Sequence, residues 1–239
     1  MEFSWISLAL PIAVVFVGGF AQGTVGFGLA LVVVPVLGQV NPEWVPGPIL
    51  LVTLLLSAVI VWREGRDVDR RTLVVPMLGQ IIGIGAALIV LGWIAPWTLS
   101  ILTGSIVLVA VALSSLGLRI QPTPPSLVVA GTLAGFMGTA ASIPGPPLAL
   151  LHQHVSPTHR RGTLAYFFVV GDSISLEGLA WTGRLSLDEI AAGLILFPAA
   201  VLGYVGSALL ADHLPASLIR RLVLIFSALG AVMLIYKAS

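Results

Sequence analysis

The chain has 239 residues, of which 58% are hydrophobic and only 9% are charged, and its formal net charge is +1. Soluble domains carry about 25% charged residues, so this composition excludes an ordinary soluble domain and indicates an integral membrane protein. The chain has no cysteine, which excludes disulfides and thiolate metal sites, and its small net charge gives no reason to expect nucleic acid as a partner.

Ten apolar segments follow one another along the chain, separated by short polar joints. We expect helices near residues 5–21, 27–40, 46–62, 73–93, 97–118, 126–140, 143–152, 162–182, 189–211 and 215–236. Strands of a membrane β-barrel would alternate in polarity, and these segments do not. A helix needs about 20 apolar residues to cross the hydrocarbon core, so the second and seventh segments are short for a full span. The predicted fold class is an all-α integral membrane protein.

Each short segment follows a break that is rich in glycine or proline. The first break lies in GGFAQGTVGFG at 18–28, and the second contains SIPGPP at 142–147. Four residues of the first half recur 112 positions later: Gly19, Gly23, Gly26 and Pro35 become Gly131, Gly135, Gly138 and Pro147. We therefore predict a single membrane domain, 1–239, made of two homologous halves, 1–118 and 126–239, joined by the linker 119–125, which contains three prolines.

Each half contains one glycine-broken hairpin, either re-entrant or fully spanning, and three transmembrane helices. The number of net crossings per half is odd, so the two halves have opposite orientations and form an inverted repeat. This plan is typical of secondary transporters, whose substrate site lies near the middle of the membrane between discontinuous helices.

The positions of the basic residues predict the topology. If each broken hairpin returns to the side on which it started, nine of the 11 Lys and Arg residues share one face: Arg63, Arg66, Arg70, Arg71, Arg119, Arg160, Arg161, Arg220 and Arg221. Only Arg184 and Lys237 lie on the other face. Short loops rich in Lys and Arg stay in the cytoplasm, so we expect a multi-pass protein of the cell (inner) membrane with both termini on the non-cytoplasmic side.

The two breaks indicate a cavity that receives an anion. Irregular backbone at membrane depth survives only where protein or a wet cavity covers it. Helix N-termini beside the breaks have free N–H groups and about half a positive charge, which suits an anion without a buried cation. The predicted substrate-binding residues are Gln22, Gly23, Thr24, Gly26, Phe27, Gly28, Gly138, Thr139, Ser142 and Gly145. The expected partners are a small anion and the lipid bilayer.

The glycine pairs Gly19-x3-Gly23 and Gly131-x3-Gly135 have a second interpretation. GxxxG patterns are often simple contacts between membrane helices, and the sequence leaves this alternative open for both pairs. It does not extend to SIPGPP, because the three prolines there cannot lie in an uninterrupted helix.

Asp172 and Glu177 lie in the segment 162–182. Five residues apart, they are separated by about 140° around a helix, so only one of them faces the site. Acids at membrane depth are functional candidates, and Asp172 is the predicted proton-coupling residue, because a poorly hydrated carboxyl group can take up and release a proton as access alternates. The alternative is a structural acid that is protonated or paired.

A metal site and an enzyme active site are the alternatives to an anion site. His152, His154 and His159 lie near the arginines of one joint without a carboxylate cluster, so we expect no metal and no cofactor. An intramembrane enzyme would need Ser142 or Ser173 within reach of a base, whereas the histidines are predicted near the cytoplasmic face. We therefore expect no enzymatic activity. A passive channel with the same fold stays open.

At the two breaks and the segments that follow them, the sequence resembles the TauE/SafE family of membrane transporters, also called the sulfite exporter or toluene-sulfonate uptake family. QGTVGFGLALVVVPVL at 22–37 looks like the family's first-half signature, and 131–147 looks like its second-half counterpart, with Ala140, Ala141 and Ser142 where a glycine run is usual. The resemblance implies export or uptake of sulfite, sulfoacetate or related organosulfonates, with export the expected direction. It also implies that Gln22, Gly23, Thr24, Gly26 and Gly28 belong to the first conserved break, and Gly135, Gly138, Ser142 and Gly145 to the second.

Overall fold

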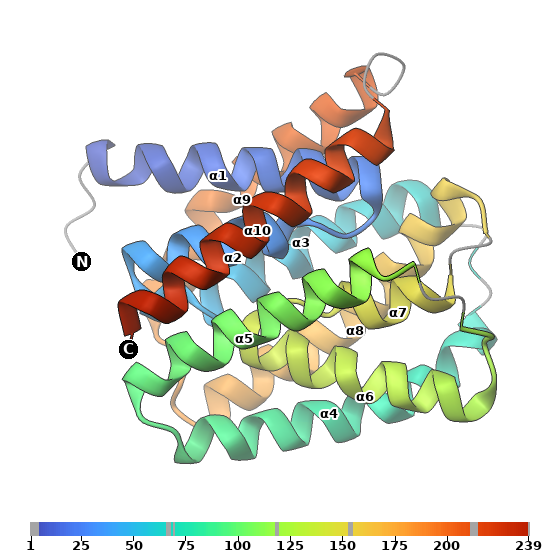
Figure 1. The fold of residues 1–239 in the computed structure, drawn as a ribbon, viewed down its shortest axis with the longest axis horizontal. Helices are drawn as coiled ribbons and strands as arrows, with labels where there is room; N and C mark the ends of the chain where they lie inside the picture. The colour runs from blue at the N-terminus through green and yellow to red at the C-terminus, as the bar shows by residue number, and fades with distance from the viewer. Residues whose placement is uncertain are drawn as a thin grey trace.

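The computed structural model describes residues 5–65, 68, 70–117, 120–152, 155–210 and 215–238, and within these ranges it contains ten α-helices and no strand (Figure 1). The helices are α1 (Trp5–Val25), α2 (Leu29–Val40), α3 (Gly47–Glu64), α4 (Val74–Trp93), α5 (Pro96–Ser115), α6 (Pro124–Ala141), α7 (Gly145–Leu151), α8 (Pro157–Trp181), α9 (Leu187–Leu210) and α10 (Ala216–Ala238). Short 3₁₀ helices lie at Pro42–Trp44 and Arg70–Leu73. The predicted all-α fold is confirmed.

Seven of these helices are long and apolar enough to cross a membrane: α1, α3, α4, α5, α8, α9 and α10. Helix α2 has 12 residues and α7 has 7. At 1.5 Å per residue they are about 18 Å and about 10 Å long, which is too short to cross the hydrocarbon core alone.

Most helix boundaries differ from the sequence-based expectation by a few residues, and three of the differences have a clear cause. Helix α1 continues to Val25 instead of ending at residue 21, because nothing before Gly26 breaks it. Helix α6 begins at Pro124, inside the expected linker, because a proline is tolerated in the first helical turn and Thr123 forms a capping box with Ser126. Helix α8 begins at Pro157, since Ser156 caps it by accepting a hydrogen bond from the His159 backbone N–H.

The helices run between two ends of the molecule. At one end, α1, α3 and α5 finish close to the first residues of α8 and α10, among which are Arg160, Arg161 and Arg220. We call this the arginine-rich end; it lies at the right of Figure 1. Helix α1 begins and α10 finishes at the opposite end, where the Lys237 ammonium donates to the backbone carbonyl of Gln39.

Glycines allow two pairs of helices to pack backbone against backbone. A Cβ atom added at Gly19 of α1 would overlap the Ala200 carbonyl of α9, and one added at Gly131 of α6 would overlap the Pro76 carbonyl of α4. In the reverse direction, Gly203 of α9 meets the backbone of Phe16, and Gly79 of α4 meets the backbone of Val128. The helix-contact interpretation of the GxxxG pairs therefore holds for these glycines.

The constant sequence offset of 112 residues between the two halves does not hold at the breaks. Gly26 follows the end of α1, whereas Gly138 lies inside α6, which continues to Ala141. Pro35 lies within α2, whereas Pro147 lies in the first turn of α7. The second break thus comes four residues, about one helical turn, later than this offset predicts, because the residues before Ser142 favour helix and the prolines after it do not.

The outer surface carries many large apolar side chains. Leu78, Ile82 and Ile89 of α4 and Leu222, Ile225 and Leu229 of α10 are all exposed. Trp62, Trp93 and Trp181 are more than four-fifths exposed, and each lies at or near the end of its helix, which is where tryptophan meets the membrane interface. With seven helices of sufficient length, this surface identifies a multi-pass membrane protein.

We predict that Gly83→Ala and Gly85→Ala, two substitutions in α4, have different effects. An added methyl group at Gly83 would overlap the Thr132 carbonyl of α6, whereas no atom lies within 4 Å of one at Gly85. Overfilling a close contact costs about 1–3 kcal/mol, so Gly83→Ala should lower the melting temperature of the purified protein in detergent. Gly85→Ala should leave it unchanged or raise it slightly. Equal melting temperatures for the two variants would contradict the close α4–α6 contact.

Candidate functional site

The two breaks meet inside the helix bundle. A Cβ atom added at Gly145 would lie 2.6 Å from the Cβ atom of Phe27, so only glycine lets the second break approach the first this closely. Between them lies a cavity of about 20 Å³, lined by Gln22, Phe27, Gly28, Ala30, Leu31, Thr53, Ser142, Ile143, Pro144, Gly145, Pro146 and Phe168. We call it the break cavity. One water needs about 10–15 Å³, so the break cavity has room for about one water.

The first break provides hydrogen-bond donors to this cavity. Gly26 has a φ of 90° and Gly28 a φ of 156°, values that favour glycine and allow the chain to turn from α1 into α2. The first hydrogen bond of α2 runs from the Val32 N–H to the Gly28 carbonyl. The N–H groups of Ala30 and Leu31 therefore have no partner within the helix, and both residues line the cavity.

Gln22 connects the end of α1 to the start of α2. Its side chain is 4% exposed, and its Oε1 accepts a hydrogen bond from the Leu29 N–H at 3.2 Å. No hydrogen bond joins its amide Nε2 to a described residue, and Gln22 is one of the residues that line the break cavity. Gln22 therefore supports the irregular backbone with its Oε1, and its Nε2 is left as a donor without a described partner.

The second break is built differently. Ser142 has a φ of 59°, in the left-handed region, and its hydroxyl donates to the Pro46 carbonyl at 3.0 Å. Helix α7 then begins at Gly145, but Pro146 and Pro147 have no backbone N–H. We expected free N–H groups at both breaks; the first turn of α2 has them, whereas the two prolines remove part of those in the first turn of α7.

The structure brings five of the predicted binding residues around the break cavity: Gln22, Phe27, Gly28, Ser142 and Gly145. Gly23 and Thr24 instead line a separate cavity of about 320 Å³ together with Arg63, Glu64 and Arg161. The Thr24 hydroxyl donates within α1 itself, with the Phe20 carbonyl at 3.0 Å.

The other three predicted residues are packed against neighbouring elements. Gly26 lies against the Arg161 side chain, and Gly138 lies against Pro144. The Thr139 hydroxyl is buried in α6, 2.8 Å from the Ser175 hydroxyl of α8.

Asp172 and Glu177 have the different environments that helical spacing predicts. Asp172 is 2% exposed, whereas Glu177 is exposed, so only Asp172 faces the interior of the helix bundle. The Thr53 hydroxyl of α3 lies 2.8 Å from Asp172 Oδ2 and 2.9 Å from the Leu50 carbonyl oxygen. Thr53 also lines the break cavity, so it lies between Asp172 and that cavity. Sequence reasoning missed Thr53, a single hydroxyl in an apolar helix.

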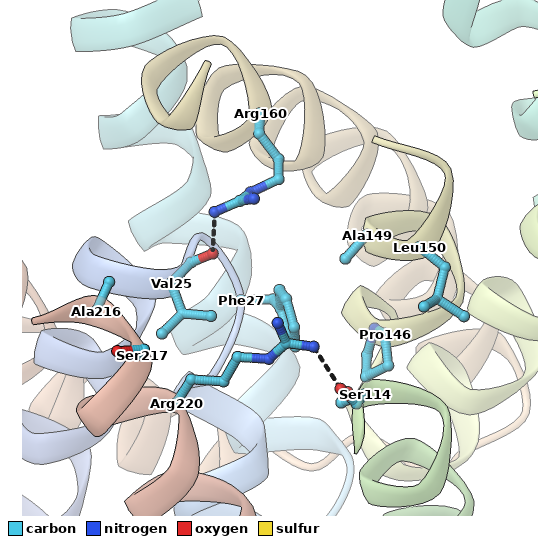
Figure 2. A pocket seen from close by; sticks show the side chains of 10 residues that line it. All are labelled: Val25, Phe27, Ser114, Pro146, Ala149, Leu150, Arg160, Ala216, Ser217 and Arg220. Atoms are coloured by element: carbon cyan, nitrogen blue, oxygen red, sulfur yellow. Dashed lines mark hydrogen bonds between the residues drawn. The ribbon is translucent and has the colours of Figure 1, made fainter. Parts of the chain in front are cut away.

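Sequence reasoning also missed the position of two arginines. Arg160 of α8 and Arg220 of α10, taken only as topology signals, line a cavity of about 230 Å³ at the arginine-rich end (Figure 2). The pair Ser156-Pro157 could have located Arg160, because serine followed by proline is a typical helix start. A helix that begins there includes Arg160 and Arg161 in its first turns. Arg161 forms an ion pair with Glu64 at 2.8 Å, and Glu64 also accepts a hydrogen bond from the Tyr204 hydroxyl at 2.6 Å.

Residues considered for metal binding or catalysis have other partners. No group of three His, Cys, Asp or Glu residues that could hold a metal occurs in the described part of the chain, and His154 lies outside it. His152 Nδ1 lies 3.0 Å from the Leu148 carbonyl oxygen, and burial is the main reason that the pKa of this imidazole lies below its usual range. The Ser173 hydroxyl donates to the Val169 carbonyl at 2.7 Å.

Gln22→Leu tests the structural role of the first break. The substitution removes the acceptor of the buried Leu29 N–H, and an unpaired buried donor costs about 1–3 kcal/mol. Gln22→Leu should therefore lower the melting temperature, whereas Gln22→Glu, which keeps a side-chain oxygen at this position, should preserve it. A Gln22→Leu protein as stable as the wild type would show that this hydrogen bond does not support the break.

The chain matches one known protein family over most of its length. The family described as Sulfite exporter TauE/SafE matches residues 11–234, a range that includes both breaks and at least part of all ten helices. No curated protein and no solved structure matches the chain. The chain belongs to the TauE/SafE sulfite exporter family of membrane transporters.

Proposed function

We propose that the protein is a secondary transporter that carries small sulfur-containing anions, such as sulfite, sulfoacetate or a related organosulfonate, by alternating access. The observation that carries this proposal is the break cavity, where the Gln22 amide and the first turn of α2 offer donors and where no Lys or Arg is among the described lining residues. Backbone N–H groups and a helix dipole suit an anion that must later be released. The sulfur chemistry and the export direction come from the family.

The proposal includes an inverted repeat of the halves 1–118 and 126–239. Matching contacts support it: α1 meets α9 through Gly19 and Ala200, as α6 meets α4 through Gly131 and Pro76. The α1–α2 hairpin turns next to Arg161 at the arginine-rich end, whereas the α6–α7 hairpin turns next to Pro46. Pro46 precedes the start of α3, and it is the opposite end of α3 that reaches the arginine-rich end. Opposed, re-entrant hairpins are the expected arrangement for a carrier whose substrate site lies at the middle of the membrane.

The orientation that we propose places the arginine-rich end in the cytoplasm. Arg63, Arg160, Arg161, Arg220 and Arg221 lie there, and basic residues near the ends of membrane helices stay on the cytoplasmic side. Both chain termini are then on the non-cytoplasmic side of the cell (inner) membrane.

We further propose that Asp172 couples transport to protons through Thr53. A threonine hydroxyl has one hydrogen, but Thr53 lies within hydrogen-bond distance of two oxygens. When Asp172 is ionised, the Thr53 hydroxyl donates to it. When Asp172 is protonated, its own O–H donates to Thr53 Oγ1, and the Thr53 hydrogen turns to the Leu50 carbonyl. In both protonation states of Asp172 the hydrogen bond between Asp172 and Thr53 is kept, because the hydroxyl of Thr53 can rotate. Thr53 also lines the break cavity.

Transport by purified protein in proteoliposomes tests the proposed function. We expect saturable uptake of radiolabelled sulfite into vesicles preloaded with unlabelled sulfite, and we expect Gln22→Glu to abolish it, because a carboxylate beside α2 repels the anion. Sulfoacetate and taurine, added outside in excess, identify the substrate by competition. Unsaturated, ohmic current would favour a channel, and absence of uptake for every sulfur-containing anion would contradict the proposal.

The pH dependence of the same uptake tests the coupling role. Asp172→Asn keeps the size of the side chain and removes the titrating group, so it should flatten the pH dependence while exchange continues. Glu177→Gln is the matched control, since it removes an exposed acid from the same helix and should leave the dependence unchanged. A normal pH dependence in Asp172→Asn would remove Asp172 from the mechanism.

A further inference from the structure

The cavity in Figure 2 lies next to the break cavity, at the arginine-rich end. Its volume is about 230 Å³, which is more than ten times that of the break cavity and leaves room for a small oxyanion with water. Arg160 reaches it from α8 and Arg220 from α10. We call this space the vestibule.

The vestibule carries positive charge that its own residues do not neutralise. Arg160 donates to the Val25 carbonyl at 3.3 Å, and Arg220 donates to the Ser114 carbonyl. Both acceptors are neutral, and neither arginine has a carboxylate partner among the described residues, in contrast to Arg161, which is paired with Glu64.

Two donors at the vestibule are buried without a partner. The Nε of Arg160 has no hydrogen-bond partner in the described structure, and neither has the hydroxyl of Ser114, a residue only 3% exposed. Buried polar groups are nearly always hydrogen-bonded, so unpaired donors beside two guanidinium groups point to a ligand that supplies acceptor oxygens and negative charge.

Only a thin partition separates the vestibule from the break cavity. Phe27 and Pro146 belong to the lining of both, Phe27 from the first break and Pro146 from the second. An anion held by the arginines is therefore one side chain away from the Gln22 amide.

We propose that the vestibule is a second anion-binding site, which holds a small oxyanion on its way between the arginine-rich face and the break cavity. The ligand has at least two acceptor oxygens on a central sulfur or phosphorus atom, because a guanidinium group binds such groups with paired hydrogen bonds. This inference rests on the proposed function for the identity of the transported anion, but not for the presence of the site.

Inorganic sulfate is a suitable probe, because its binding can be measured whether or not it is transported. We expect purified full-length protein in a neutral detergent to bind sulfate in a calorimetric titration. Hydrogen bonds to charged groups are strong enough that Arg160→Gln or Arg220→Gln should weaken binding about tenfold or more. Arg221→Gln is the matched control: it removes an exposed charge from the next position of α10 and should bind as the wild type does.

Ser114→Ala guards against misfolding of the arginine variants. It removes the unpartnered hydroxyl but keeps the backbone carbonyl that Arg220 contacts, so it should weaken sulfate binding without lowering the melting temperature. The inference is overturned if the wild type binds no sulfate, or if Arg160→Gln, Arg220→Gln and Ser114→Ala all bind it as tightly as the wild type.

Two further measurements separate the possible failures. Sulfate binding that depends on Arg220, without transport of any sulfur-containing anion, would contradict the proposed function and leave the vestibule site standing. Transport of such an anion, with sulfate binding unchanged in Arg160→Gln, Arg220→Gln and Ser114→Ala, would do the reverse. In nanodiscs, displacement of sulfate by phosphatidylglycerol but not by phosphatidylcholine would identify a lipid phosphate as the ligand and overturn the role in anion passage.

Discussion

Backbone polar groups cannot remain unpaired in the hydrocarbon core of a membrane, and this chain has two interrupted helices within its bundle. The two breaks contact each other, and side chains next to each break pair with its backbone or with that of a neighbouring segment. Phe27 packs against Gly145, Gln22 pairs with the Leu29 N–H, and Ser142 pairs with the carbonyl that precedes α3. The remaining helices hold this arrangement through backbone contacts at glycine, α1 on α9 and α4 on α6. The cavity exists because two breaks that cannot face lipid face each other.

The two breaks are alike in position but not in chemistry. The first ends in a helix with free N–H groups and a glutamine amide, whereas prolines remove part of the donors from the second. In the mechanism that we propose, the first break would hold the anion and the less polar second break would move past it. The vestibule carries the two arginines on one side of the partition, whereas neutral donors lie beside the break cavity on the other side. On the path that we propose, an anion would meet no fully buried cation, which would bind it too tightly for release.

Much of the fold could be predicted from the sequence, because apolar length, glycine and proline specify membrane helices directly. All ten segments were expected, and the breaks fall within a few residues of their predicted places. The errors have physical causes: α6 and α8 begin earlier because proline fits a first turn, and Gly138 lies one turn before the break that it was expected to mark. Thr53 and the vestibule arginines could not be found in this way, since their roles arise from contacts between segments far apart in the chain.

The central claim is that the break cavity opens alternately to the two sides of the membrane. The chain has no cysteine, so a single Ala30→Cys substitution places one thiol on the cavity lining without further changes. At about 20 Å³, the break cavity is too small to admit a charged thiosulfonate reagent. Labelling of the thiol therefore reports that the cavity has opened. We expect labelling by the impermeant reagent from either side of sealed, oriented vesicles, and no labelling of the buried control Ala87→Cys. Labelling of Ala30→Cys from one side only, or from neither, would contradict alternating access.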